Sequence, residues 1–282
     1  MSYLQRAKTF RTKKRLGQNF LVDERVISSI IENANIQKDD IIVEIGAGVG
    51  FVTEQLVKYA NHVYAIEIDE DAIKELKKID SQNLTIINQD ILKTDISAFA
   101  DDKKVKIVAN IPYYITGPII AHLLGEIDDL DNKNRNSISE ILIMVQKEVA
   151  QRIVANENSP SKQYGLLSIL SQFWADCEII KNVGRKSFYP APKVDSAIVK
   201  MIVNEKPRIY LDDYTHFRKT IRAAFSQRRK NIKNCLLSGG FLKENIQKAL
   251  SLVDIDENKR AESISIEKFT QLSKELIKNA QS

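Results

Sequence analysis

Residues 41–50 read Ile-Ile-Val-Glu-Ile-Gly-Ala-Gly-Val-Gly, an apolar run that ends in a turn with glycine at alternate positions. The apolar run predicts a buried strand, and the glycines at positions 46, 48 and 50 let the backbone bend sharply and approach a ligand closely. A helix is expected over residues 51–59, so that amide groups at its start would face a polar ligand. The spacing differs from that of a phosphate-binding loop, because the pattern G-x-x-x-x-G-K-[ST] is missing.

Acidic side chains stand at the ends of the next two predicted strands. The strand over residues 62–67 ends with Glu67, and the strand over residues 84–88 is followed by Asp90. A carboxylate at the first position could bind the two hydroxyls of a ribose, and one at the second could accept a hydrogen bond from an adenine amino group. Each acid alone is more often a solvated loop charge, but together they predict a nucleoside pocket. Without a phosphate loop, this pocket suits an adenosine with an uncharged link, such as S-adenosylmethionine.

The tetrapeptide Asn110-Ile111-Pro112-Tyr113 follows a further apolar run at residues 105–109. Its residue types suit the methylation of a planar amino group without a general base. The side-chain oxygen of Asn110 and the backbone carbonyl of Pro112 could accept hydrogen bonds from the two amine protons, which favours a pyramidal nitrogen. Tyr113 would supply a flat face for an unstacked base. Asn and Pro also punctuate ordinary turns, but the glycine turn upstream favours chemistry.

Alternating strand and helix patterns over residues 23–155 predict an α/β fold with a doubly wound, mostly parallel sheet. Asp23 is expected to cap the first helix. Two later apolar runs, at 177–183 and 196–203, should close the sheet as an antiparallel hairpin whose long connection carries Phe188. The predicted parallel strands are at 41–45, 62–67, 84–88, 105–109 and 139–145.

The pattern changes after a polar, proline-containing linker at residues 204–208. Beyond it only helices are expected, with Gly239-Gly240 as a break. The predicted helices are at roughly 212–225, 228–237, 241–251 and 266–279. The chain of 282 residues is therefore expected to contain a large catalytic domain at 1–203 and a small all-helical C-terminal domain at 204–282.

Cysteine and histidine positions exclude several classes of protein. Cys177 and Cys235 are isolated, and the three histidines are scattered, so neither a metal site nor a disulfide framework is expected. No apolar stretch approaches 18 residues, so no segment is expected to span a membrane. The basic N-terminus slightly resembles a transit peptide, but it runs directly into residues 16–21 and is interpreted as part of the mature protein. These features indicate a cytoplasmic protein.

The net charge of +5 conceals two strongly basic, acid-free segments. Without the 13 bases of these segments, 29 bases stand against 37 acids, a remainder of −8. Clustered bases of this kind are typical of contact with a phosphate backbone, although a solvated surface would give the same count. The bases are Arg6, Lys8, Arg11, Lys13, Lys14 and Arg15 in residues 1–22, and Arg218, Lys219, Arg222, Arg228, Arg229, Lys230 and Lys233 in residues 214–237.

Taken together, these motifs resemble the rRNA adenine dimethyltransferases of the KsgA type over almost the whole chain. The matching motifs are Leu16–Leu21, Glu44–Gly50, Glu67, Asp90, Asn110–Tyr113 and Phe188–Ser196. The resemblance implies a Rossmann-like class I methyltransferase sheet. It implies cofactor contacts by Asn19, Leu21, Gly46, Gly48, Glu67, Asp90 and Asn110, a catalytic role for Pro112, and contacts of Tyr113 and Phe188 with the target adenine.

The same resemblance implies a product and a partner. The product would be a pair of adjacent dimethyladenosines in the 3′-terminal hairpin of small-subunit rRNA, made by a monomer acting on the immature small subunit. The basic segments predict RNA contacts by Arg218, Arg222, Arg228, Arg229 and Lys230. The stretch Phe225–Lys230 resembles the small-subunit enzymes more than the related Erm enzymes, which methylate a large-subunit rRNA adenine. Two competing functions stay open, a DNA adenine methyltransferase and a primarily non-catalytic assembly factor.

Overall fold

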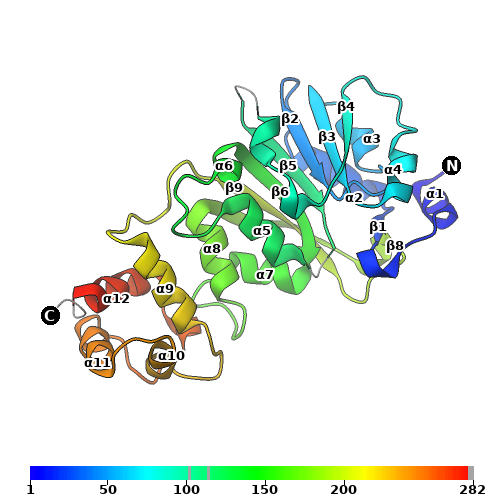
Figure 1. Ribbon diagram of the computed structural model, residues 1–282. Helices are drawn as coiled ribbons and strands as arrows, with labels where there is room; N and C mark the ends of the chain where they lie inside the picture. The colour runs from blue at the N-terminus through cyan, green and yellow to red at the C-terminus, as the bar shows by residue number, and fades with distance from the viewer. Residues whose placement is uncertain (101–102, 113–114, 279–282) are drawn as a thin grey trace. The chain divides into compact units, whose positions relative to one another are not determined.

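The computed structural model of the chain describes residues 1–100, 103–112 and 115–278 (Figure 1). By its internal contacts the chain divides into two compact units, and helix α7 (Lys147–Val154) crosses the division after Ala150. The first unit contains residues 1–125, 131–150 and 175–205, and the second contains residues 126–130, 151–174 and 206–282.

A seven-stranded sheet is the centre of the first unit, with strand order β4-β3-β2-β5-β6-β9-β7 (Figure 1). The first five strands in this order run parallel, and β9 pairs antiparallel with both β6 and β7. The predicted α/β fold, its parallel strands and its closing antiparallel pair are therefore confirmed. The strands are β2 (Ile41–Ile45), β3 (His62–Glu67), β4 (Leu84–Asn88), β5 (Val105–Asn110), β6 (Ile138–Gln146), β7 (Ala175–Val183) and β9 (Ser196–Val203).

Helices and short 3-10 turns connect the strands of this unit. Asp23 caps α2 by accepting a hydrogen bond from the backbone N–H of Arg25. The apolar faces of α2 and α3 pack with β2, β3 and β5 in one buried cluster. This packing holds the strands, and with them the loops that follow the strand ends, in position. The helical elements are α2 (Glu24–Asn33), α3 (Thr53–Leu56), α4 (Glu70–Leu76), η2 (Ile91–Lys93), η3 (Ile96–Phe99), α5 (Thr116–Leu124) and α6 (Lys133–Asn136).

The N-terminal segment contains structure that the sequence did not indicate. Helix α1 (Tyr3–Thr9) begins with a capping box between Ser2 and Gln5, and the turn η1 (Lys14–Leu16) follows it. Strand β1 (Phe20–Leu21) then pairs antiparallel with β8 (Phe188–Tyr189), after the turn η5 (Arg185–Ser187). Asp23 caps α2, the first helix of the α/β pattern that begins at residue 23, as predicted, and α1 lies before this pattern with a capping box of its own.

The second unit is helical. Helices α9, α10, α11 and α12 contact one another in succession, and α9 also contacts α12. Helix α10 begins at Ile232 and not at residue 228, because Asn231 caps it through the backbone N–H of Asn234; residues 228–230 therefore lie in a loop. Gly239 and Gly240 separate α10 from α11, as predicted. The elements are α8 (Leu166–Trp174), which was not predicted, α9 (Tyr214–Ala224), α10 (Ile232–Ser238), α11 (Lys243–Leu252), η6 (Ala261–Ser263) and α12 (Ile266–Lys278).

Candidate cofactor-binding and catalytic site

A cavity of about 290 Å³ lies at the carboxyl ends of β2, β3, β4 and β5, within the first unit. Loops that follow neighbouring parallel strands meet at this edge of a sheet, which is where open α/β sheets bind ligands. One further wall comes from the N-terminal segment. The lining residues are Leu16–Phe20, Ile45, Gly46, Gly48, Ile66–Ile68, Gln89–Leu92, Asn110–Pro112, Ile115 and Ile119.

The glycine turn after β2 has φ angles that would be strained for other residue types. Gly46 and Gly48 have φ angles of +73° and +57°. A Cβ atom on Gly46 would lie 3.1 Å from the backbone oxygen of Asn110, and one on Gly48 would lie 3.1 Å from the ring of Phe20. The predicted sharp bend is thus present, and the turn packs closely against the backbone of Asn110 and the ring of Phe20. The helix expected over 51–59 is only the single turn α3, because the chain first passes through the turn 49–52, so a helix N-terminus contributes little here.

Glu67 lies at the end of β3, lines the cavity and is buried. The N–H of Gly48 donates to Oε2 (2.7 Å), and the N–H groups of Ile68 and Asp69 donate to Oε1 (both 2.8 Å). Burial raises the pKa of the Glu67 carboxyl, and these three backbone donors oppose the rise. A carboxylate has about four acceptor sites, so this side chain has room for one further hydrogen bond.

Asp90, Asn110 and Pro112 line the same cavity. Asp90 caps η2 by accepting a hydrogen bond from the backbone N–H of Leu92 (3.0 Å). Asn110 is the last residue of β5, and its half-buried side chain follows the buried part of the strand. The structure therefore brings together the residues predicted at three separate strand ends. Tyr113 lies outside the described residues.

The predicted residues of the N-terminal motif divide into two groups. Asn19 lines the cavity, and its Nδ2 donates to the backbone oxygen of Gly17 (2.9 Å). Leu21 does not line it, because its side chain packs in the apolar cluster and its backbone pairs with Phe188. Phe188 belongs to the same cluster, with 3% of its surface exposed, and does not line the cavity. A base could stack on this ring only after a local rearrangement exposed it.

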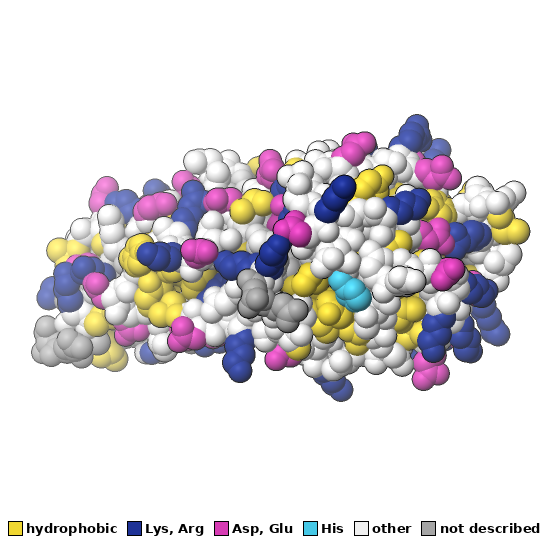
Figure 2. Space-filling model, turned by 90° about the horizontal axis from the view of Figure 1, so that it is seen from above, with side chains coloured by type: hydrophobic (Ala, Val, Ile, Leu, Met, Phe, Trp, Pro, Cys, Tyr) yellow, Lys and Arg dark blue, Asp and Glu magenta, His cyan; other side chains and the backbone are white. Residues whose placement is uncertain are grey.

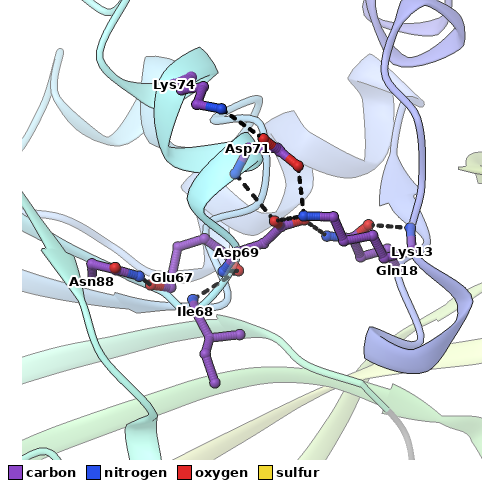
Figure 3. A network of polar contacts seen from close by, with 8 residues as sticks. All are labelled: Lys13, Gln18, Glu67, Ile68, Asp69, Asp71, Lys74 and Asn88. Atoms are coloured by element: carbon purple, nitrogen blue, oxygen red, sulfur yellow. Dashed lines mark hydrogen bonds and ion pairs between the residues drawn. The ribbon is translucent and has the colours of Figure 1, made fainter.

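A polar network behind the cavity wall was not predicted. Figure 3 shows Lys13 and Gln18 pointing from the N-terminal segment toward the acids at the start of α4. Lys13 Nζ lies 2.5 Å from Asp69 Oδ1 and 2.6 Å from Asp71 Oδ2, and Gln18 Nε2 donates to Asp69 Oδ2 (2.6 Å). Because these partners are about fifty residues apart, no periodicity or local motif could have indicated them.

Glu44 is a second buried carboxyl of this unit. It lies in β2, and the hydroxyl of Thr53 donates to its Oε2 (2.5 Å). Burial raises the pKa of Glu44 to about 8; the Thr53 hydroxyl opposes this rise and the nearby Glu67 adds to it. Glu44 is not among the lining residues of the cavity. Glu44 is therefore mostly protonated at neutral pH. Its hydrogen bond with Thr53 joins β2 to α3, the two elements on either side of the glycine turn.

The basic side chains of the second unit also divide into two groups. Arg218 Nε lies 3.1 Å from Glu126 Oε2 and Arg222 Nη2 lies 2.6 Å from Glu126 Oε1, so both bases share an acid of the same unit. Arg228, Arg229 and Lys230 are exposed in the loop before α10. On the face drawn in Figure 2, Lys and Arg side chains are likewise interspersed with Asp and Glu.

The N-terminal bases are partly paired as well. Arg6 Nη2 lies 2.5 Å from Glu54 Oε1, and its guanidinium lies over the ring of Phe51. Arg6 and Lys13, both among the bases of residues 1–22, are therefore held by acids of the same unit. A charge count along the sequence overstates the number of bases that can meet a phosphate.

The described part of the chain shows neither a metal site nor a membrane-spanning helix. Among residues 1–100, 103–112 and 115–278, no group of three or more His, Cys, Asp or Glu side chains is placed to hold a metal ion. None of the helices described in these ranges is long and apolar enough to cross a membrane.

The parallel sheet with its antiparallel closing strands and the cavity at its carboxyl edge define a class I methyltransferase. Residues 9–278 match the family model of the ribosomal RNA adenine dimethylases, and the chain belongs to this family. The family is one of methyltransferases, which implies S-adenosylmethionine as the methyl donor.

Individual relatives agree with this assignment. The chain is 42% identical to "Ribosomal RNA small subunit methyltransferase A" of Clostridium acetobutylicum, over 95% of each chain. A crystal structure of a dimethyladenosine transferase from Plasmodium falciparum is similar with a TM-score of 0.71 and 28% identity, covering 92% of this chain and 97% of the other. The 23S rRNA methyltransferase ErmE shares the fold, with a TM-score of 0.66 and 24% identity over 92% of this chain and 100% of the other.

Proposed function

We propose that the chain transfers methyl groups from S-adenosylmethionine to the exocyclic amines of two adjacent adenines in the 3′-terminal hairpin of small-subunit rRNA, giving dimethyladenosines. The observation that carries this proposal is that Asn110 and Pro112 line the same cavity as Gly46, Glu67 and Asp90. Family membership and the small-subunit name of the 42% identical relative support the choice of substrate.

The residues around the cavity fit the methyl donor. Gly46 and Gly48 line the cavity in a turn with positive φ angles, so the backbone of this turn can approach the methionine part. Glu67 would offer its remaining acceptor site to a ribose hydroxyl, and Asp90, which lines the same cavity, would accept from an adenine amino group. When bound, the donor supplies an electrophilic methyl group. Asn19 and the turn together would hold its methionine end.

Asn110 and Pro112 prepare the nucleophile. The side-chain oxygen of Asn110 and the backbone oxygen of Pro112 accept hydrogen bonds from the two protons of the adenine amine, and the nitrogen lone pair then points toward the methyl group. After transfer the nitrogen is positively charged and acidic, so its proton leaves to water and no general base is needed. Tyr113 would provide the stacking face for the flipped base, and Phe188 a second face once its ring is exposed.

The division of labour follows the chain. Residues 1–203, apart from 126–130 and 151–174, would bind the cofactor and catalyse transfer. Residues 204–282 would bind RNA, chiefly through Arg228, Arg229 and Lys230, with Arg218 and Arg222 in support. Residues 151–174 cluster with the C-terminal helices, so they would belong to the RNA-binding part. We infer that the protein acts as a monomer in the cytoplasm on the immature small ribosomal subunit.

A labelled-methyl assay separates the candidate functions. Immature small subunits should accept label from S-adenosylmethionine, whereas naked large-subunit rRNA and duplex DNA should not. Label in large-subunit rRNA would favour an Erm-like activity, and label in duplex DNA a DNA methyltransferase. Tight binding to immature subunits without any label would instead favour a non-catalytic role in assembly.

Replacing Glu67 should weaken cofactor binding. Glu67→Ala removes a charge-assisted hydrogen bond to the ribose and the support of three backbone N–H groups, so the dissociation constant for S-adenosylmethionine should rise by about ten- to a hundredfold. Calorimetry measures this change. Glu70→Gln, an exposed acid on α4, is the matched control and should leave the constant unchanged. Equal affinity of Glu67→Ala and wild type would reject the ribose assignment.

Neutralising the loop bases should weaken RNA binding and flatten its salt dependence. The triple variant of Arg228, Arg229 and Lys230 to glutamine removes three exposed positive charges. Each lost phosphate contact should reduce the log–log salt slope by somewhat under one unit. The triple variant of Lys243, Lys248 and Lys259 removes the same charge from exposed positions elsewhere in the unit. If both variants bind immature small subunits with the same affinity and slope, the loop is an ordinary solvated surface.

A further inference from the structure

The wall of the cavity formed by residues 16–20 lies outside the seven-stranded sheet. At its C-terminal end it is tied down by the pairing of β1 with β8. At its N-terminal end it is tied down by Gln18, whose Oε1 accepts from the backbone N–H of Lys13 (2.7 Å) and whose Nε2 donates to Asp69. The oxygen and the nitrogen of one side-chain amide therefore close the loop 13–18 and fasten it to the sheet side of the cavity.

Asp69 contacts both walls of the cavity (Figure 3). Its backbone N–H donates to Oε1 of Glu67, which lines the sheet wall, and its carboxylate accepts from Gln18, which lines the N-terminal wall. Asp69 itself is not a lining residue, and 2% of its surface is exposed. It is placed to act on the cofactor only through these two neighbours.

We propose that residues 13–20 form a strap that closes the cofactor cavity, and that Asp69 is the positioning residue that holds this strap closed over the bound cofactor. The inference rests on the proposed function, because it takes S-adenosylmethionine as the occupant of the cavity. Lys13 belongs to the strap and not to the RNA contacts, since its ammonium lies between the carboxylates of Asp69 and Asp71.

The polar contacts that hold the strap to Asp69 and Asp71 are weak enough for the strap to open. The Lys13 side chain is 30% exposed and that of Asp71 49% exposed, so water competes for this ion pair and it contributes little to closure. Gln18 donates its hydrogen bond to the side chain of Asp69, which is only 1% exposed. These contacts are few: the Gln18–Asp69 hydrogen bond, the Lys13–Asp69 ion pair and the solvated Lys13–Asp71 pair. They can break and form again without unfolding the sheet.

The reaction gives such a strap a purpose. Two dimethyladenosines need four methyl groups, and each transfer leaves S-adenosylhomocysteine in the cavity. The spent molecule must be exchanged before the next transfer, so the cavity has to close for chemistry and open between turnovers. Asp69 would set how fast this exchange proceeds.

Stopped-flow displacement of S-adenosylhomocysteine from the full-length protein tests the strap. Asp69→Asn and, as a variant outside α4, Lys13→Met should release the ligand faster, Asp69→Asn by about ten- to a hundredfold and Lys13→Met by less. The KM for S-adenosylmethionine should rise while kcat at saturation changes little. Asp71→Asn leaves the Gln18–Asp69 bond in place and is the matched control, with a release rate close to wild type.

Hydrogen exchange supplies a readout that is independent of activity. Binding of S-adenosylhomocysteine should protect the amides of residues 13–19 in the wild type, and this protection should be lost in Asp69→Asn. Wild-type release rates and wild-type protection in Asp69→Asn and Lys13→Met would overturn the strap. If the wild type binds the ligand but Glu67→Ala leaves the affinity unchanged, the cavity assignment fails instead, so the two failures are distinguishable.

Discussion

Replacing Asn110 by alanine is expected to slow methyl transfer by about 10²–10³-fold, because one preorganised polar group at the reacting centre is lost. The fold should survive, since Asn110 is half-buried at the last position of β5 and the core residues of that strand precede it. Its backbone oxygen, which lies next to Gly46, is kept by alanine. Cofactor affinity should therefore change much less than the rate.

Single-turnover labelling of immature small subunits at saturating S-adenosylmethionine measures this effect, and calorimetry with S-adenosylhomocysteine measures binding in parallel. Asn110→Gln is the useful second variant, because it keeps the amide but moves it by one methylene group. It should recover only part of the rate if the position of the acceptor matters. Near-normal turnover in Asn110→Ala would remove Asn110 from the mechanism.

The sheet and the cavity could be predicted because local patterns determine them. Apolar runs of strand length located the strands, and Gly46 and Gly48 had to be glycine in a turn with positive φ angles. Parallel strands share one carboxyl edge, so Glu67, Asp90 and Asn110 were expected to meet, and they line one cavity.

Contacts between distant segments could not be predicted. The two-residue strands β1 and β8 are too short to show a period, so neither their pairing nor the burial of Phe188 was foreseen. The charge pattern makes Lys13 and Arg222 candidates for RNA contact. It cannot show that each of them pairs with an acid, because Asp69 and Glu126 are far away in the sequence. The sequence predicts a helix from residue 228, whereas α10 begins at Ile232 because Asn231 caps it.

The other large effect concerns stability and lies inside the sheet. Burial raises the pKa of Glu44 from 4.5 to about 8. Between these two pH values the folded chain binds a proton that the unfolded chain has lost, so the free energy of unfolding falls as pH rises. At most the slope is about 1.4 kcal/mol per pH unit, and the whole window amounts to roughly 5 kcal/mol. Below pH 4.5 both states carry the proton, so the slope vanishes and the full stability is retained.

Glu44→Gln should remove this dependence, because a glutamine stays neutral and keeps an acceptor for the Thr53 hydroxyl. Urea unfolding followed by circular dichroism should show a variant that gains stability over the wild type as pH rises from 5 to 8, by roughly 4 kcal/mol at the upper end. Thr53→Val is the second variant, because it deletes the hydroxyl that favours the charged carboxylate of Glu44. The pKa of Glu44 should then be higher than in the wild type, so the stability of this variant should keep falling to a higher pH. A difference between Glu44→Gln and wild type that stays constant across this range would mean that Glu44 is ionised in the folded protein. Its carboxylate would then have to be stabilised by a partner other than Thr53, and the interior of the sheet beneath the glycine turn would carry a negative charge.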